Sequence, residues 1–358
     1  MTTKFTFGKL HHFIVEELPP YFRAAGKKSW SQQFFEMNRI YRRYRWVPYH
    51  YLKHSLYLKS FDGDLLSYLP AKMMERFIEE SNPKSHVELA LNKRLFSQEM
   101  SKVGLPVVRD LFVVVGDDKI YSGEGQLLSY VEFQGEVAQS TKNFFFKPTF
   151  GSLGKGAFNM SPGEIHKRGN DEFVRRLFQD FPEKLERSYL VQHAIEQHQT
   201  LASLASQSVN TVRIDTFWDG KRIVTNSAVL RVGNGISPTD NWAAGGLIVK
   251  IDFATGKLVG LGKRKAKFGK QNFERHPVSG VTFAELQLPY WAEVKTLAER
   301  AALELLPLRC IGWDVAITVD GPVLIEANDN YDIFLSQEAY GGYRDTPLGK
   351  ATLRHAGH

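Results

Sequence analysis

The stretch Gly312-Trp-Asp-Val-Ala-Ile-Thr-Val-Asp-Gly-Pro-Val-Leu-Ile-Glu-Ala-Asn328 predicts a β-hairpin with a cation site at its open end. An apolar strand turns at Asp320-Gly-Pro322 and returns as a second apolar strand. Asp314 stands at the outer end of the first strand, and Glu326 and Asn328 stand at the outer end of the second. Antiparallel pairing would bring these three oxygen ligands together, and hard cations such as Mg²⁺ prefer oxygen ligands. The alternative is a hairpin whose polar ends bind nothing.

The composition is that of an ordinary globular protein with a large core. Of the 358 residues, 43% are hydrophobic and 24% are charged, so we expect two or three domains or lobes. The single cysteine, Cys310, has apolar neighbours, which favours a buried structural thiol over a nucleophile. The sequence shows no long apolar run and no signal-peptide core, so we expect a cytoplasmic protein.

The N-terminal 60 residues carry the positive charge of the chain. They hold eleven Lys or Arg against three Glu, a balance of +8, whereas the whole chain has a formal net charge of +7. Aromatic residues are interleaved with these cations, which suits an anionic glycan or the inner face of a membrane. The alternative is a helical region with solvated basic faces. Nucleic acid is not expected, because no recognition motif accompanies the charge.

The order of predicted elements indicates an α+β protein with mixed antiparallel sheets. We expect a mostly helical region over 1–85, a first α/β lobe over 86–195 and a second over 196–358. Helices are predicted over 87–103, 171–181 and 291–306, and strands over 107–115, 144–146, 189–195, 211–218, 223–232, 247–252 and 257–261.

A glycine-rich loop, Gly151 to Gly156, follows a lysine at a strand end, Lys147. It is neither a Walker A loop nor a dinucleotide fingerprint, because the glycine spacing differs from both. The backbone of Gly151 and Gly154 and the hydroxyl of Ser152 could face a triphosphate, with Lys147 against the α and β phosphates. A glycine-rich hairpin beside an ordinary surface lysine is the alternative.

The order of these segments resembles the ATP-grasp superfamily. Asn92-Lys93 resembles the start of its ATP-binding unit, which makes Lys93 a second phosphate ligand. The stretch Val191 to Ile195 resembles the strand that joins the two lobes, where the backbone of Gln192, His193 and Ala194 would bond the adenine edge. The resemblance leaves two candidates for the ribose partner, Gln199 and Glu196.

Further segments are similar to the alpha-L-glutamate ligase branch and most similar to the sugar-transfer associated ATP-grasp proteins. Asn210-Thr-Val-Arg213 with the later Arg231 resembles a pair of arginines in that branch, and Asn241 to Gly246 resembles its Gly-Gly turn. The chain departs from the ligase pattern at Asp329-Asn-Tyr-Asp332, so the acceptor pocket is expected to differ there.

The resemblance implies a carboxylate–amine ligase that uses ATP and Mg²⁺, with Mn²⁺ as a substitute, and forms an acyl phosphate. Asp314, Glu326 and Asn328 would hold the metal, and Arg213 and Arg231 would act in catalysis. A structural ion pair is the alternative for either arginine. The substrates would be a sugar acid or glycan precursor and an amine. The basic stretch at Lys263 to Lys270 would meet an anionic acceptor or form a solvated loop. The alternatives are a phosphotransferase and a non-catalytic ATP-binding module.

Overall fold

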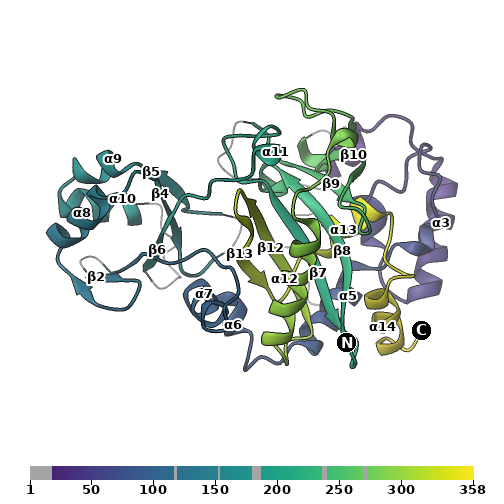
Figure 1. Ribbon diagram of the computed structural model, residues 1–358. Coiled ribbons are helices and arrows are strands. Elements are labelled where there is room, and N and C mark those ends of the chain that lie inside the picture. The colour runs from purple at the N-terminus through teal and green to yellow at the C-terminus, as the bar shows by residue number, and fades with distance from the viewer. Residues whose placement is uncertain (1–17, 117–118, 152–153, 180–186, 236–239, 269–271) are drawn as a thin grey trace.

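The computed structural model describes residues 18–116, 119–151, 154–179, 187–235, 240–268 and 272–358. Two antiparallel sheets form two lobes, with a helical unit beyond the larger sheet (Figure 1). The predicted α+β class with two lobes and a helical N-terminal region is confirmed.

The small lobe is a six-stranded sheet with one helical face. The strand order is β3-β2-β1-β6-β4-β5. Phe133 of α8 and Phe173 of α10 pack with Phe146 of the sheet in one hydrophobic cluster. The helices therefore bury this face of the sheet. Lys147 and Gln192 alternate with residues of the buried face and therefore point to the opposite one. The elements are β1 Phe112–Val115, β2 Lys119–Ser122, β3 Leu127–Leu128, α8 Tyr130–Ala138, β4 Phe144–Pro148, β5 Phe158–Met160, α9 Pro162–His166, α10 Asn170–Phe178 and β6 Ser188–His193.

The large lobe is a seven-stranded sheet with the strand order β11-β10-β9-β8-β7-β12-β13. Helix α12 (Trp291–Glu304) packs on one face together with α6 (Glu88–Leu91) and α7 (Lys93–Lys102), and Phe96 of α7 contacts the buried Trp313. Helix α13 (Ile333–Tyr340) lies on the other face (Figure 1). The strands are β7 Thr211–Trp218, β8 Ile223–Val232, β9 Leu247–Ile251, β10 Leu258–Arg264, β11 Asn272–Phe273, β12 Cys310–Thr318 and β13 Gly321–Asn328. The short helices are α11 Gln199–Ala202, η3 Trp242–Ala244, η4 Ala266–Phe268 and η5 Phe283–Glu285.

The two ends of the described chain share one helical core. Tyr44 and Ile78 from the N-terminal part pack with Tyr343 and Leu348 from the C-terminal part, and this cluster rests on Phe217 and Cys310 of the large sheet. Cys310 is a buried free thiol, as predicted. The helices are α2 Leu18–Arg23, α3 Trp30–Tyr44, α4 Tyr49–Lys53, η2 Leu65–Ser67, α5 Ala71–Ser81 and α14 Pro347–His355.

Two predicted elements differ from the structure for local reasons. The helix expected over 87–103 breaks at Asn92, whose backbone is extended and whose side chain accepts hydrogen bonds from the N–H groups of Arg94 and Leu95. The strand expected over 107–115 begins only at Phe112, since Val107 forms a separate bridge with Leu324 of the large sheet. The predicted division of the chain at 85 and 195 stays a prediction.

Candidate active site

The hairpin predicted from the sequence is present, and its register brings the expected ligands together. Asp314 of β12 pairs with Glu326 of β13, and Gly312 pairs with Asn328. A register shift after Asp314 leaves Ile325 without a paired residue. In a regular strand Glu326 would share a face with the core residue Leu324, and the bulge instead turns it toward the side chain of Asp314.

Two arginines from neighbouring strands bind Asp314. Arg213 lies opposite it on β7 and donates from Nε to Oδ1 at 2.6 Å, while Arg231 on β8 donates from Nη2 to Oδ2 at 2.8 Å. Burial alone would raise the pKa of Asp314, but the two guanidinium groups lower it below its usual range. Burial and the charge of Asp314 together raise the pKa of Glu326. The carboxylates of Asp314 and Glu326 thus face each other, and Arg213 and Arg231 bind the first of them.

The residues at this hairpin end fit a divalent cation. Two carboxylates that face each other repel, and a hard cation between them would relieve this repulsion. Asn328 donates its Nδ2 to the carbonyl of Gly312 at 3.1 Å, which turns its amide oxygen away from that carbonyl. Within the described ranges, no three His, Cys, Asp or Glu residues gather as a metal site. The protein would therefore supply two carboxylates and one amide, and substrate phosphates would complete the shell.

The two predicted lysines lie near these carboxylates but come from other elements. Lys93, at the start of α7, donates from Nζ to the carbonyl of Gly151 at 2.6 Å and lies in the field of Glu326. Lys147 is buried on β4. Burial lowers its pKa to about 8, against the opposing charges of Asp110 and Glu326. The structure thus places four cationic side chains around one carboxylate pair.

The end of β6, which was predicted to bind adenine, places the side chains of Gln192 and His193 on opposite faces of the small sheet. The side chain of Gln192 is buried and donates to Asp110 Oδ1 at 2.7 Å on the face that carries Lys147. His193 Nε2 lies on the helical face, 3.3 Å from Ser140 Oγ, and the N–H of Ala194 donates to the carbonyl of Asn143 at 2.8 Å. A cavity of about 480 Å³ opens beside His193 and is lined by twelve residues, among them Arg109, Asp110 and Lys142. The Ala194 N–H is thus used within the sheet, whereas the edge at His193 borders open space.

The remaining predicted nucleotide residues lie in exposed positions. Gly151 and Gly154 are exposed, with φ of 114° and 67°, and Ser152 lies outside the described residues. Gln199 is exposed at the start of α11, and Glu196 lies 3.4 Å from Lys142 Nζ. The assignment of the ribose partner stays open between these two side chains.

Sequence reasoning missed three buried acids that support the site. Asp215 shares a strand face with Arg213 and accepts hydrogen bonds from Ser227 and Ser336, both at 2.6 Å. Asp240 lies 3.4 Å from Arg231, and Asp110 binds Gln192. Asp215 follows Arg213 by two residues on a predicted strand, which was the available signal. Asp110 lies within the strand predicted over 107–115 and offered the same kind of signal, whereas Asp240 lies in a connecting segment and offered none.

The segment that departs from the ligase pattern is largely a packing element. Tyr331 is 2% exposed and belongs to the helical core. A Cβ added to Gly312 would lie 2.7 Å from the Cβ of Tyr331, so the ring is seated directly on the open end of the hairpin. The expectation that this segment shapes an acceptor pocket stays a prediction for Asp329, Asn330 and Asp332, while Tyr331 faces the protein interior.

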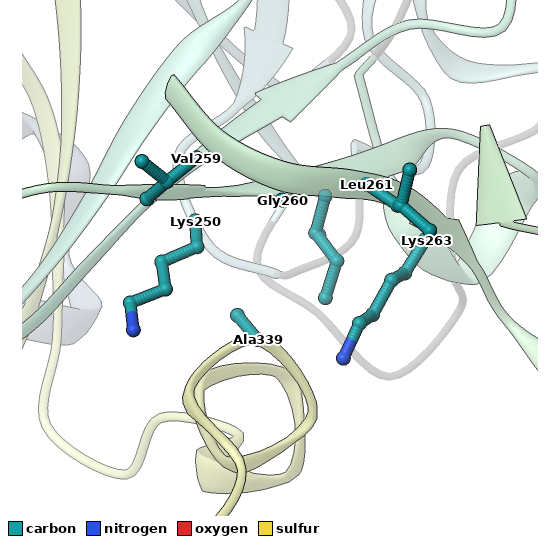
Figure 2. Close-up of a pocket in the computed structure, with 7 residues that line it drawn as sticks. Lys250, Val259, Gly260, Leu261, Lys263 and Ala339 are labelled. Carbon is teal, nitrogen blue, oxygen red and sulfur yellow. The ribbon is translucent and has the colours of Figure 1, made fainter. Parts of the chain in front are cut away.

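The predicted basic stretch begins at Lys263 within β10, and this lysine and Lys250 of β9 both have structural partners, while Lys270 lies outside the described residues. Lys263 Nζ donates to the carbonyl of Glu338, and Lys250 Nζ lies 4.7 Å from the centre of the Tyr340 ring. Figure 2 shows both lysines flanking α13 below the bulged strand at Gly260. The cavity there measures about 280 Å³. Because the lysines face the last turn of α13, where helix carbonyls carry partial negative charge, stabilisation of that helix end accounts for them.

A family model described as "Sugar-transfer associated ATP-grasp" matches residues 72–343. No curated protein matches the sequence. Similar solved structures include D-alanyl-alanine synthetase A from Vibrio cholerae O1 biovar eltor str. N16961, at 10% identity and a TM-score of 0.41, with 77% of this chain and 63% of that chain covered. The ATP-grasp ligase PsnB with minimal precursor, Mg and ADP has 13% identity and a TM-score of 0.39, with 78% and 62% covered. D-cycloserine synthetase DcsG has 15% identity and a TM-score of 0.43, with 81% and 82% covered. The chain thus spans less than two thirds of the first two.

Proposed function

The chain belongs to the sugar-transfer associated ATP-grasp family, and we propose that it is an ATP- and Mg²⁺-dependent carboxylate–amine ligase that forms an acyl phosphate. One observation carries the proposal: a row of Arg213, Asp314 and Glu326 crosses three adjacent strands and lies near Lys93 and Lys147. This arrangement combines oxygen ligands with cations, which is what the attack of a carboxylate on ATP requires.

The charges of the site explain how its residues would act. A carboxylate that attacks the γ-phosphate meets a second anion, so the barrier contains strong electrostatic repulsion. Lys93 and Lys147 would neutralise the phosphates, and Arg213 and Arg231 would orient the substrate carboxylate or the γ-phosphate with their planar forks. Bound Mg²⁺ would be held by Asp314, Glu326 and Asn328 and would neutralise phosphate charge.

The glycine-rich loop would exclude water from the reaction. Lys93 Nζ binds the carbonyl of Gly151, so the start of this loop is fastened beside the lysines. Residues 152–153 lie outside the described part. A cover over the phosphates would protect an acyl phosphate from hydrolysis until the amine arrives.

We propose a sugar acid or glycan precursor as the carboxylate substrate, in polysaccharide biosynthesis in the cytoplasm. This part of the proposal is supported by the description of the family. No helix among the described residues is long and apolar enough to cross a membrane.

A phosphotransferase acting on an acid or alcohol would use the same metal ligands and cationic side chains and stays the enzymatic alternative. A non-catalytic ATP-binding module is disfavoured because both opposed carboxylates, the amide and all four cations are present. The two alternatives differ in products, since one yields a phosphorylated substrate and the other yields no turnover.

The decisive experiment is a phosphate-release screen of the purified chain with ATP, Mg²⁺ and pairs of sugar acids and amines, followed by mass spectrometry. We expect ADP, phosphate and an amide in equal amounts for the true pair. Glu326→Gln should abolish this signal, while Asp320→Asn should retain it, because Asp320 is an exposed acid at the turn of the same hairpin. A phosphorylated product without an amide would replace the ligase by the phosphotransferase.

A further inference from the structure

Helix α3 exposes large aromatic side chains on the outside of the helical unit. Trp30, Phe34 and Phe35 are 75%, 64% and 71% exposed, while Ile40 and Tyr44 anchor the same helix in the core. The neighbouring Phe22 is 67% exposed. Figure 1 places α3 at the end of the molecule far from the small lobe. Together with Tyr41, these four exposed rings form what we call the α3 surface.

The cations around the α3 surface lack acidic neighbours in the sequence. Residues 18–60 contain nine Lys or Arg and one acid, Glu36. Glu36 is turned inward, where it accepts hydrogen bonds from Lys28 Nζ at 3.0 Å and from Tyr51 Oη at 2.6 Å. The outer arginines at positions 39, 42, 43 and 45 are all exposed. The surface therefore presents aromatic rings and positive charge together.

These features separate the candidate partners by their chemistry. A second copy of the chain is unsuitable, because two surfaces of the same strong positive charge repel. Single-stranded nucleic acid is usually bound in a groove, whereas α3 presents a convex helix. An anionic lipid bilayer fits both the aromatic rings and the arginines, since aromatic rings partition into the headgroup region and arginines bind lipid phosphates.

We propose that the α3 surface docks the protein onto anionic membranes, with the rings of Trp30, Phe34 and Phe35 in the headgroup region and Arg39 and Arg42 on lipid phosphates. The helix is held in place by the rest of the fold, so its exposed rings need no folding step to bind. The contact is peripheral, because no described helix could cross the bilayer. Nothing in this inference depends on the ligase chemistry, so vesicle binding and turnover can fail separately.

The test is co-sedimentation of the full chain with vesicles of phosphatidylcholine alone and of three parts phosphatidylcholine to one part phosphatidylglycerol. We expect binding to the anionic vesicles and at least ~10-fold weaker partition to the neutral ones, since each basic residue adds to the attraction. The triple variant Trp30→Ser, Phe34→Ser, Phe35→Ser and the double variant Arg39→Glu, Arg42→Glu should each lose at least ~10-fold in partition.

Matched controls lie on the small lobe. Val131 is 76% exposed on α8, and Lys119 is exposed on β2. Val131→Ser and Lys119→Glu should therefore leave partition unchanged. Thermal melts monitored by circular dichroism should agree among all variants, because every changed side chain is exposed.

Tryptophan fluorescence gives a second readout without a destabilising change. Of the six tryptophans, Trp30 is strongly exposed, Trp46 and Trp218 are partly buried, and the other three are buried, so the emission of Trp30 should shift to the blue most strongly with anionic vesicles. Trp30→Phe should remove the shift and keep the binding. Absence of wild-type binding to anionic vesicles, equal binding to neutral vesicles, or full binding by the triple variant would each overturn the proposal. Capture of an acidic protein by this surface without vesicle binding would overturn it as well.

Discussion

Asp314→Asn is the sharpest test of the site, because Asp314 serves two functions in the structure. It is 2% exposed, binds Arg213 and Arg231 through both carboxylate oxygens, and faces Glu326. The amide keeps the size of the side chain and removes its charge. The substitution therefore separates the charge from the packing.

The magnitude follows from the two buried guanidinium groups that lose their partner. Breaking a buried ion pair costs about 3–5 kcal/mol, and we expect about 3 kcal/mol because Asp215 and Asp240 still lie beside the arginines. The melting temperature of the metal-free protein should fall by about 6 °C, at roughly 2 °C per kcal/mol. Turnover should fall at least ~100-fold, because a fixed charge in such a site contributes on the order of 3 kcal/mol to lowering the barrier.

The assays are thermal melts without nucleotide and phosphate release at saturating ATP and Mg²⁺. Asp320→Asn is the matched control, because Asp320 is an exposed acid at the turn of the same hairpin, and both quantities should stay at wild-type values. Turnover by Asp314→Asn within about 3-fold of the wild type would refute the metal assignment. A melting temperature equal to that of the wild type would refute the claim that the arginines depend on this charge.

Three further predictions test the remaining parts of the site. Lys147→Ala should weaken ATP binding about 10-fold or more by isothermal titration. Because burial lowers the pKa of Lys147 to about 8, the affinity of the wild type for ATP should fall as pH rises through that value. This pH dependence should vanish in the variant. Asp215→Asn should raise KM for the carboxylate substrate more than it changes the affinity for ATP, since Asp215 lies behind Arg213; an unchanged KM would refute this positioning. Gly312→Ala should lower the free energy of unfolding by about 1–3 kcal/mol in urea melts, because its methyl group would meet Tyr331. Gly321→Ala is the comparison, because a Cβ there has open space around it but the backbone φ is 121°, so any loss measured for this variant comes from backbone strain and not from packing.

The sequence predicted the parts of the site that depend on local pattern. Strands β7 and β8 begin and end at the predicted residues, and the hairpin brings Asp314 and Glu326 together as antiparallel pairing requires. The bulge at Ile325 was not predicted, because two apolar runs of similar length do not reveal an extra residue. Side-chain alternation counted from Leu324 would have placed Glu326 on the core face, whereas the predicted pairing of the two strand ends brought it to Asp314.

Contacts between distant segments were beyond the reach of sequence patterns. Asn92 ends one helix and begins the next, and the signal for this is a single side chain within an otherwise regular amphipathic stretch. The joining of the N-terminal helices with Tyr343 and Leu348 depends on tertiary packing between segments nearly 300 residues apart. Asp110 lies just before β1, outside the strand that the structure forms, and Asp240 lies in a loop, where no periodicity indicates the direction of a side chain.

The balance of charge predicts that metal binding at Asp314 and anion binding by Arg213 and Arg231 are coupled. Asp314 binds Arg213 through one carboxylate oxygen and Arg231 through the other, so this carboxylate engages both guanidinium groups. A divalent cation at Asp314 and Glu326 would take over part of the neutralisation of Asp314 and leave both arginines freer to bind an incoming anion. Arg213 would then keep Asp215 as a partner, and Arg231 would keep Asp240, so neither would be left as a lone buried charge. Affinity for the carboxylate substrate should therefore rise when Mg²⁺ is present even without ATP, and titration calorimetry that finds equal affinity with and without Mg²⁺ would contradict this coupling.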